Sequence, residues 1–141
     1  MATVKGIPVE MDLLIASSTG KHIEAKVREV YIETEDGELG VLPGHQPEFY
    51  SVGAGFVRFK DSEGNEVTKI LFKGFVQIEP DIVRIGVEEL YEPGEVDVEE
   101  VGKEISELKE KLSSLSEEEE EARHKLESEI AKRESLIKKA R

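Results

Sequence analysis

Cysteine is absent from this sequence, and basic residues are few compared with acidic ones. Without cysteine the chain has no disulfide, no thiolate nucleophile and no cysteine-based zinc site. The 19 lysine and arginine residues stand against 32 aspartate and glutamate residues, which gives a formal charge of -13. A charge of this sign repels nucleic-acid phosphates and anionic lipid head groups. We therefore expect no nucleic-acid partner and no direct insertion into lipid.

Long apolar runs, targeting signals and phosphate-binding loops are also missing. No stretch approaches the roughly 20 apolar residues that span a membrane, and the first residues, MATVKGIPVEMD, lack the pattern of a signal peptide. There is no Walker-type phosphate loop and no GxSxG nucleophile elbow. The sequence predicts a cytoplasmic chain of 141 residues, which is long enough for one compact domain with a small appendage.

The first two thirds of the chain have the alternating pattern of half-buried strands. Val9, Met11, Leu13 and Ile15 fall on one face of such a strand. Turn-forming residues then separate further apolar runs. The strands expected from these runs are Val27–Thr34, Gly55–Lys60, Val67–Lys73, Phe75–Glu79 and Ile82–Val87. Many short strands at this spacing predict a β-sandwich or barrel over residues 1–94.

The pattern changes to a helical period after Pro93-Gly94, and residues 95–141 are expected to form a separate two-helix domain. Asp97 and Glu100 have the spacing of a capping box, as do Ser116 and Glu119. The serines between Ser113 and Ser116 predict a turn between two antiparallel helices. The apolar seam expected on the first helix is Val98, Val101, Ile105, Leu108, Leu112 and Leu115. The stripe expected on the second helix is Ala122, Leu126, Ile130, Ile137 and Ala140, with Arg133 in an apolar place.

The segment GELGVLPGHQP, residues 37–47, is rich in glycine and proline and contains one of the three histidines. Gly37 is expected to close a turn, Leu39 and Val41 to point inward, and Pro43-Gly44 to turn the chain again. We interpret the segment as a rigid corner. The alternative is an enzyme acting through His45, which requires that histidine to be buried in a pocket with a shifted pKa.

The histidines do not predict a metal site, and no catalytic residue is expected. His22, His45 and His124 lie in a hairpin, the corner and a helix, so no two of them share a ligand spacing. Composition and periodicity alone also fit a free-standing β-sandwich adaptor with a coiled-coil arm that binds other proteins. The proteins with which the chain co-purifies would test that alternative.

Three stretches in this order resemble the epsilon subunit of F-type ATP synthases. They are GELGVLPGH, then GFVQIEPDIVRI at residues 74–85, and then the charged helical pair. The resemblance implies a β-sandwich of about ten strands followed by a C-terminal antiparallel α-helical hairpin. It implies a non-catalytic central-stalk subunit without a cofactor, peripheral to the cytoplasmic face of the bacterial inner membrane through the synthase complex. That subunit couples ion-driven rotation of the c ring to ATP synthesis and restrains ATP hydrolysis through movable helices.

The resemblance also implies partners and contact residues. The sandwich would bind the gamma subunit and the c-subunit ring, and the extended hairpin would reach the catalytic β subunits. The contact residues implied for gamma or the c ring are Glu38, Leu42, Pro43, Gly44 and His45. The inhibitory basic face implied on the helices is Arg123, Lys125, Lys132, Arg133, Lys138 and Lys139.

Some members of this family bind ATP through an Ile/Leu-Asp-x-x-Arg-Ala stretch at the start of the first helix. The corresponding residues here are Val96, Asp97, Glu100 and Val101, so the motif is degenerate. Glu100 places an anion where the family has a phosphate-pairing cation. We therefore expect weak ATP binding or none.

Overall fold

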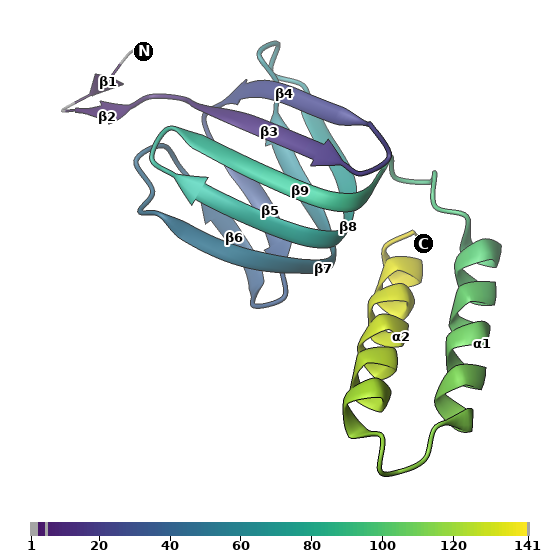
Figure 1. The fold of residues 1–141 in the computed structure, drawn as a ribbon. Helices are drawn as coiled ribbons and strands as arrows, with labels where there is room; N and C mark the ends of the chain where they lie inside the picture. Colours follow the sequence, from purple (N-terminus) through teal and green to yellow (C-terminus); the bar gives the residue numbers. More distant parts are fainter. Residues whose placement is uncertain (1–2, 5, 141) are drawn as a thin grey trace. The chain divides into compact units, whose positions relative to one another are not determined.

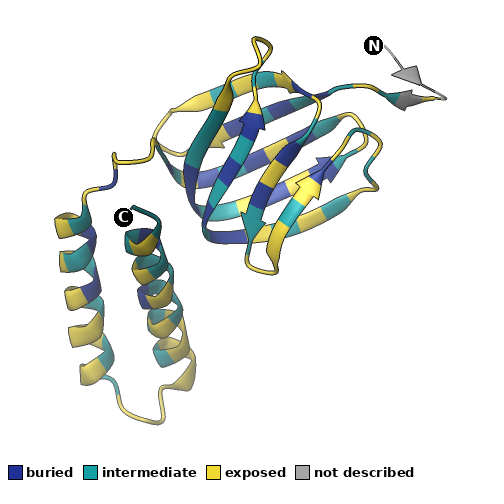
Figure 2. Cartoon of the chain, turned by 180° about the vertical axis from the view of Figure 1, so that it is seen from behind, coloured by how far each residue is buried: buried dark blue, intermediate teal, exposed yellow. Residues whose placement is uncertain are grey.

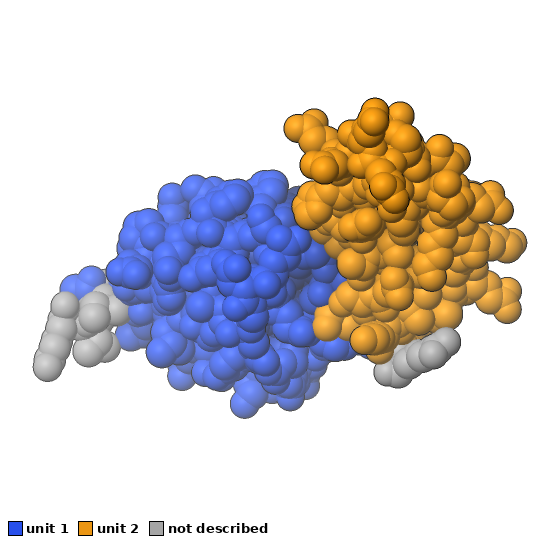
Figure 3. Space-filling model, turned by 90° about the horizontal axis from the view of Figure 1, so that it is seen from below, with its two compact units in different colours: residues 1–93 blue, residues 94–141 orange. Residues whose placement is uncertain are grey.

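The computed structural model describes residues 3–4 and 6–140 and divides the chain into two compact units, residues 1–93 and 94–141 (Figure 3). The first unit is built from strands and the second from two helices (Figure 1). The strands among the described residues are β1 (Thr3–Val4), β2 (Ile7–Pro8), β3 (Met11–Ser17), β4 (His22–Val27), β5 (Val30–Thr34), β6 (Gly37–Val41), β7 (Glu48–Lys60), β8 (Glu66–Glu79) and β9 (Ile82–Tyr91). No helix in the described part of the chain is long and apolar enough to cross a membrane.

Seven of the strands form one sheet in the order β4-β3-β9-β8-β7-β5-β6, in which only β3 and β9 pair in parallel. Val27 of edge strand β4 and Val41 of edge strand β6 nevertheless belong to the same buried cluster. A flat sheet cannot bring both edges into one core, so the sheet folds over on itself into two layers. Buried residues alternate with exposed ones along the strands (Figure 2). The predicted β-sandwich is confirmed, with nine strands among the described residues where about ten were expected.

The faces of the first strands follow the prediction with one exception. Met11, Leu13 and Ile15 are fully buried or nearly so, whereas Val9 lies outside β3 and is 38% exposed. The predicted strand Val27–Thr34 is confirmed only from Val30 to Thr34, because β4 ends at Val27 and β5 begins at Val30. Strand β4 pairs with β3, while β5 pairs with β6 and β7, so the chain changes partner strands at this bend.

Strand β8 changes the side that faces the core at Lys73. Leu71 before this residue and Val76 after it are both in the core, so the inward positions shift from odd to even numbers. Lys73 has a φ of 59°, which residues with a side chain adopt only rarely. The alternation is interrupted here without ending the strand. The two strands predicted over residues 67–73 and 75–79 are therefore one strand of 14 residues.

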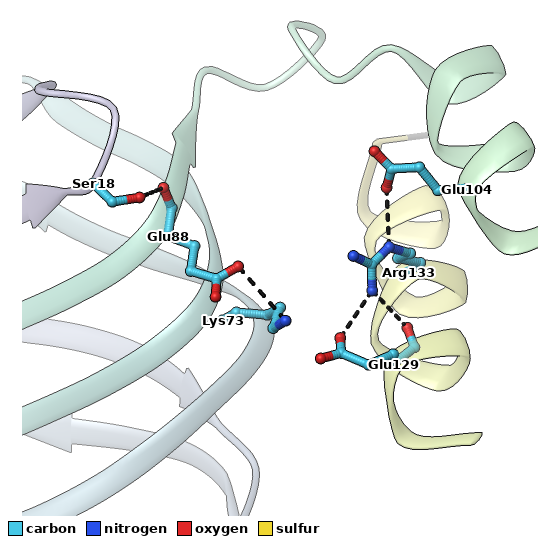
Figure 4. A network of polar contacts seen from close by, with 6 residues as sticks. All are labelled: Ser18, Lys73, Glu88, Glu104, Glu129 and Arg133. Carbon is cyan, nitrogen blue, oxygen red and sulfur yellow. Dashed lines mark hydrogen bonds and ion pairs between the residues drawn. The ribbon is translucent and has the colours of Figure 1, made fainter. Parts of the chain in front are cut away.

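The same shift occurs opposite Lys73 in both neighbouring strands. In β7 the core residues are Val52 and then Val57, and in β9 they are Val87 and then Leu90. The backbone pairing passes over Lys73 on both sides, from Phe72 to Gly74. Lys73 Nζ lies 3.6 Å from Glu88 Oε2, and Ser18 Oγ donates a hydrogen bond of 2.8 Å to the Glu88 carbonyl oxygen (Figure 4). These contacts join β8, β9 and the turn that follows β3.

The second unit is an antiparallel pair of helices, α1 (Val98–Ser114) and α2 (Glu120–Ala140). The Asp97 side chain accepts a 3.1 Å hydrogen bond from the Glu100 backbone N–H, so the predicted cap of the first helix is confirmed. The second predicted capping box is wrong. Glu119 N–H donates to the main-chain carbonyl oxygen of Ser116, and α2 begins at Glu120.

The apolar seam of α1 is largely as predicted, whereas that of α2 is broader. Val101 and Ile105 are buried on α1, and Ile130 is buried on α2. Ala122 was expected in the seam but is exposed, because it lies in the first turn of α2. Leu136 was not expected there and is only 1% exposed. The buried surface of α2 therefore covers more than a single stripe.

The cap at Asp97 gives a first prediction. Replacing Asp97 with alanine should lower the stability of the hairpin by about 1 kcal/mol, because the Glu100 N–H loses its acceptor. The matched control is Ser116→Ala, which should leave stability within about 0.5 kcal/mol because only its main chain bonds to Glu119. Helicity followed by circular dichroism during thermal unfolding measures both. Equal losses in the two variants would contradict the assignment of the caps.

Candidate functional site

The corner over residues 37–47 is fixed by backbone contacts. Gly37 closes the hairpin between β5 and β6 with a φ of 115°, as predicted. Gly44, with a φ of 86°, donates its N–H to the Pro80 carbonyl oxygen at 2.8 Å, and His45 N–H donates to the Leu42 carbonyl oxygen at 3.1 Å. The turn at Leu42–His45 is thereby tied to the turn between β8 and β9. These hydrogen bonds fix the orientation of the corner relative to strands β8 and β9.

His45 is engaged inside the corner. Its Nδ1 lies 2.8 Å from the Gln46 carbonyl oxygen, and its Nε2 lies 3.2 Å from Glu48 Oε1. Both ring nitrogens therefore have local partners, which leaves neither directed toward a substrate. The side chain is 20% exposed and orders the loop that contains it. Among the described residues, no group of three or more histidine, cysteine, aspartate or glutamate side chains is arranged to hold a metal ion.

The predicted contact residues separate into two groups. Leu42, Pro43, Gly44 and His45 share the turn, and Leu42 projects from it with 59% of its surface exposed. Glu38 lies earlier, on the outward face of β6, while Leu39 and Val41 face the core as expected. Glu38 Oε1 accepts a 2.6 Å hydrogen bond from Arg58 Nη2 on β7.

An exposed aromatic pair, Phe49 and Phe75, was not predicted as a site. The residues lie on neighbouring strands β7 and β8 and are 64% and 44% exposed. Their rings stack with centroids 5.5 Å apart and an interplanar angle of 16°. Phe75 lies against Gly86 of β9, where a Cβ would come within 2.8 Å of the Phe75 Cζ atom. The glycine thus makes room for a flat aromatic surface, and large exposed apolar groups of this kind mark interaction sites.

The sequence did contain a signal for this pair. The core-facing positions around Phe49 are the even-numbered Tyr50 and Val52, so period-two alternation places Phe49 on the outer face. The same reading places Phe75, next to the buried Val76, outside. Phe75 begins one of the expected strands, whereas Phe49 lies before the expected strand Gly55–Lys60, in the part of β7 that was not predicted.

The basic residues of the hairpin do not form one free face. Arg123 Nη1 lies 3.4 Å from the Leu112 carbonyl oxygen and 3.3 Å from that of Leu115, so it binds the end of α1. Arg133 binds Glu104 of α1 at 2.9 Å and Glu129 of α2 at 2.8 Å (Figure 4). The remaining four are exposed at Lys125 and Lys138 and half-buried at Lys132 and Lys139.

Ion pairs with Glu104 and Glu129 hold Arg133 in the interior of the hairpin. Burial alone lowers the pKa of this guanidinium, but the hydrogen bonds and negative charges of Glu129 and Glu104 outweigh burial, and the pKa is raised. The side chain is 18% exposed, compared with 20% for Glu129 and 44% for Glu104. This pairing explains why an arginine is accommodated where an apolar residue was expected.

The degenerate ATP stretch is occupied by structural contacts. Val96 and Val101 are buried, and the Asp97 carboxylate caps α1. Glu100 is exposed and contributes its N–H to that cap. The expectation of weak or no ATP binding stays a prediction.

Comparison with known proteins gives a consistent result. Residues 10–102 match the family described as ATP synthase, Delta/Epsilon chain, beta-sandwich domain. The ATP synthase epsilon chain of Bacillus pumilus is 30% identical over 126 residues, which are 89% of this chain and 88% of that one. The epsilon chain of Halalkalibacterium halodurans is 37% identical over 86 residues, or 60% of this chain. That match spans 63% of the length of the relative.

Two solved structures share the fold. A chain of the mitochondrial ATP synthase of Euglena gracilis aligns with a TM-score of 0.68 and 24% identity, covering 96% of this chain and 84% of that chain. A chain from the central stalk and c ring of the Tetrahymena thermophila enzyme gives 0.60 and 13%, covering 93% of this chain and 96% of its own. With the family match over the sandwich and a relative aligned along most of both chains, this chain belongs to the ATP synthase epsilon chain family.

Proposed function

We propose that the chain is the non-catalytic central-stalk subunit of an F-type ATP synthase, which couples rotation of the c ring to ATP synthesis. Membership of the epsilon family and the order of sandwich and hairpin support this function. Both solved structures with this fold come from ATP synthase assemblies that contain a c ring. In this proposal the subunit is held at the cytoplasmic face of the bacterial inner membrane by the complex, and it does not insert into lipid.

The observation that carries the proposal is the exposed aromatic pair on a rigid sandwich face. Phe49 and Phe75 are fixed against each other and against Gly86, so binding a partner orders few additional groups. Aromatic residues are enriched where proteins contact each other. We assign this surface to the gamma subunit. The corner with Leu42, Pro43, Gly44 and His45, together with the outer face around Glu38, is assigned to the c ring.

The hairpin is assigned the restraint of ATP hydrolysis. In this proposal the two helices separate and extend, and their basic residues reach the catalytic β subunits. A basic residue is available to contact the β subunits only where it does not already bind another group within the folded hairpin. Lys125 and Lys138 are exposed, whereas Arg123 and Arg133 bind within the hairpin.

The assignment of the gamma surface is tested by substituting serine for each phenylalanine of the pair. Phe49→Ser and Phe75→Ser should each weaken binding to the purified gamma subunit about tenfold, since each removes a large apolar contact. The matched control is Val9→Ser, an exposed apolar residue outside β7 and β8, which should bind normally. Isothermal titration calorimetry gives the affinities. If gamma binds both phenylalanine variants as tightly as the unchanged chain, the pair is not its docking surface.

A further inference from the structure

Three neighbouring strands place a second exposed cluster on the outer face of the sandwich. Tyr31 of β5 pairs directly with Gly40 of β6 on one side and with Arg58 of β7 on the other. The Arg58 guanidinium lies over the Tyr31 ring, 5.2 Å from its centroid, and also binds Glu38. We call Tyr31, Arg58 and Glu38 the arginine cluster.

Each part of the arginine cluster is held in place. A Cβ at Gly40 would lie 3.2 Å from Tyr31 Cε1, so the glycine lets the ring lean over β6. The Tyr31 hydroxyl donates to Glu29 Oε2 at 3.3 Å, and the charge of Glu29 and this hydrogen bond raise the pKa of Tyr31. Arg58 is thus positioned by a ring beneath it and by the Glu38 carboxylate beside it.

Arg58 retains donors for another molecule. The guanidinium nitrogen Nη2 donates to Glu38 Oε1 at 2.6 Å. The other terminal nitrogen, Nη1, lies 4.0 Å from Glu66 Oε1, which is beyond hydrogen-bond distance. The side chain is 43% exposed. Stacked, partly exposed arginine and tyrosine side chains are the residue types that contribute most to protein interfaces.

We propose that Arg58 is the recognition residue of this face, and that Tyr31 and Glu38 are its positioning residues. The partner surface is a polar loop that offers oxygen acceptors, either backbone carbonyl groups or carboxylates, to the free guanidinium donors. This inference rests on the proposed function, in which the loop belongs to the c ring. It assigns to Arg58 the direct contact that the family resemblance places on Glu38.

The charges of the cluster support this assignment. Glu38 is already paired with a cation at 2.6 Å, so a second cation arriving at Glu38 meets the positive charge of Arg58. An oxygen acceptor arriving at Arg58 meets donors that are already oriented. Exposed ion pairs contribute little free energy because solvent screens them, so a contact made by Glu38 alone adds little affinity.

The test measures binding of the full chain to a purified assembly of gamma and the c ring. Arg58→Ala should weaken binding about tenfold, and Arg58→Lys should not restore it, because lysine keeps the charge but lacks the planar fork. Glu38→Gln should weaken binding only about twofold to threefold. Lys26→Ala removes an exposed cation that also has a carboxylate partner at 2.6 Å, and it should bind normally. Thermal unfolding of each variant shows whether the sandwich is intact.

The outcomes separate this inference from the proposed function. Binding that is lost in Phe49→Ser but unchanged in Arg58→Ala overturns the inference alone. An Arg58→Lys variant that binds like the unchanged chain, or an equal loss in Lys26→Ala, shows that only net charge matters and also overturns it. An unchanged chain that does not bind the assembly at all overturns both.

Discussion

Replacing Gly74 with alanine is expected to lower the unfolding free energy of the sandwich by about 3 kcal/mol or more. A Cβ at this position would overlap the Gly86 carbonyl oxygen and come within 2.7 Å of Val87 Cα. Both neighbours are backbone atoms of β9, the strand paired with β8 at this point. Neither can move without breaking the pairing next to Lys73. Urea unfolding followed by circular dichroism measures the loss.

The chain supplies a control that makes the same chemical change in an open position. Gly102 lies within α1, and an added Cβ there meets no atom within 4 Å. Because alanine is the better helix former, Gly102→Ala should stabilise the hairpin by up to about 1 kcal/mol. A small effect of Gly74→Ala, comparable with that of Gly102→Ala, would show that β8 and β9 can separate to accept the methyl group.

The sequence predicted the β-sandwich and the two helices because their periods are local properties. Alternation marked Met11, Leu13 and Ile15 as buried, and the Asp97 cap followed from spacing alone. The shift of the inward face at Lys73 was not predictable in this way. It depends on a positive φ that lysine rarely adopts and that neighbouring strands hold in place.

The turns of the candidate site were predictable from the sequence, whereas its contacts between distant strands were not. Gly37 and Gly44 indicated the corner because positive φ favours glycine, and alternation placed Leu39 and Val41 inward. The partner of Glu38 lies 20 residues away on another strand, so no local pattern indicated that Arg58 would bind it. The serine spacing likewise indicated a cap at Ser116 that the side chain does not make, because the turn continues to Glu119.

The second large effect is expected in the hairpin. Arg133→Ala should lower hairpin stability by about 2 to 3 kcal/mol, because the charged hydrogen bonds to Glu104 and Glu129 are lost together. The two carboxylates are then left without the cation that joins α1 to α2. The matched control combines Arg133→Met with Glu104→Gln and Glu129→Gln. It removes all three charges and should stay close to the original stability. Thermal unfolding followed by circular dichroism compares them.

The same substitution separates two roles for Arg133 in ATP hydrolysis by the reconstituted synthase. If Arg133 mainly holds the hairpin closed, a loss of about 2 kcal/mol raises the open population about 30-fold, and the proposed restraint becomes stronger. If it mainly contacts the catalytic β subunits, Arg133→Ala releases the restraint and hydrolysis rises. The contacts with Glu104 and Glu129 favour the first outcome.

Lys138→Ala provides the comparison, because Lys138 is exposed and has no ion pair with any residue that the structure describes. Hydrolysis should rise in Lys138→Ala and fall in Arg133→Ala, and a rise in both would place Arg133 with the inhibitory cations instead.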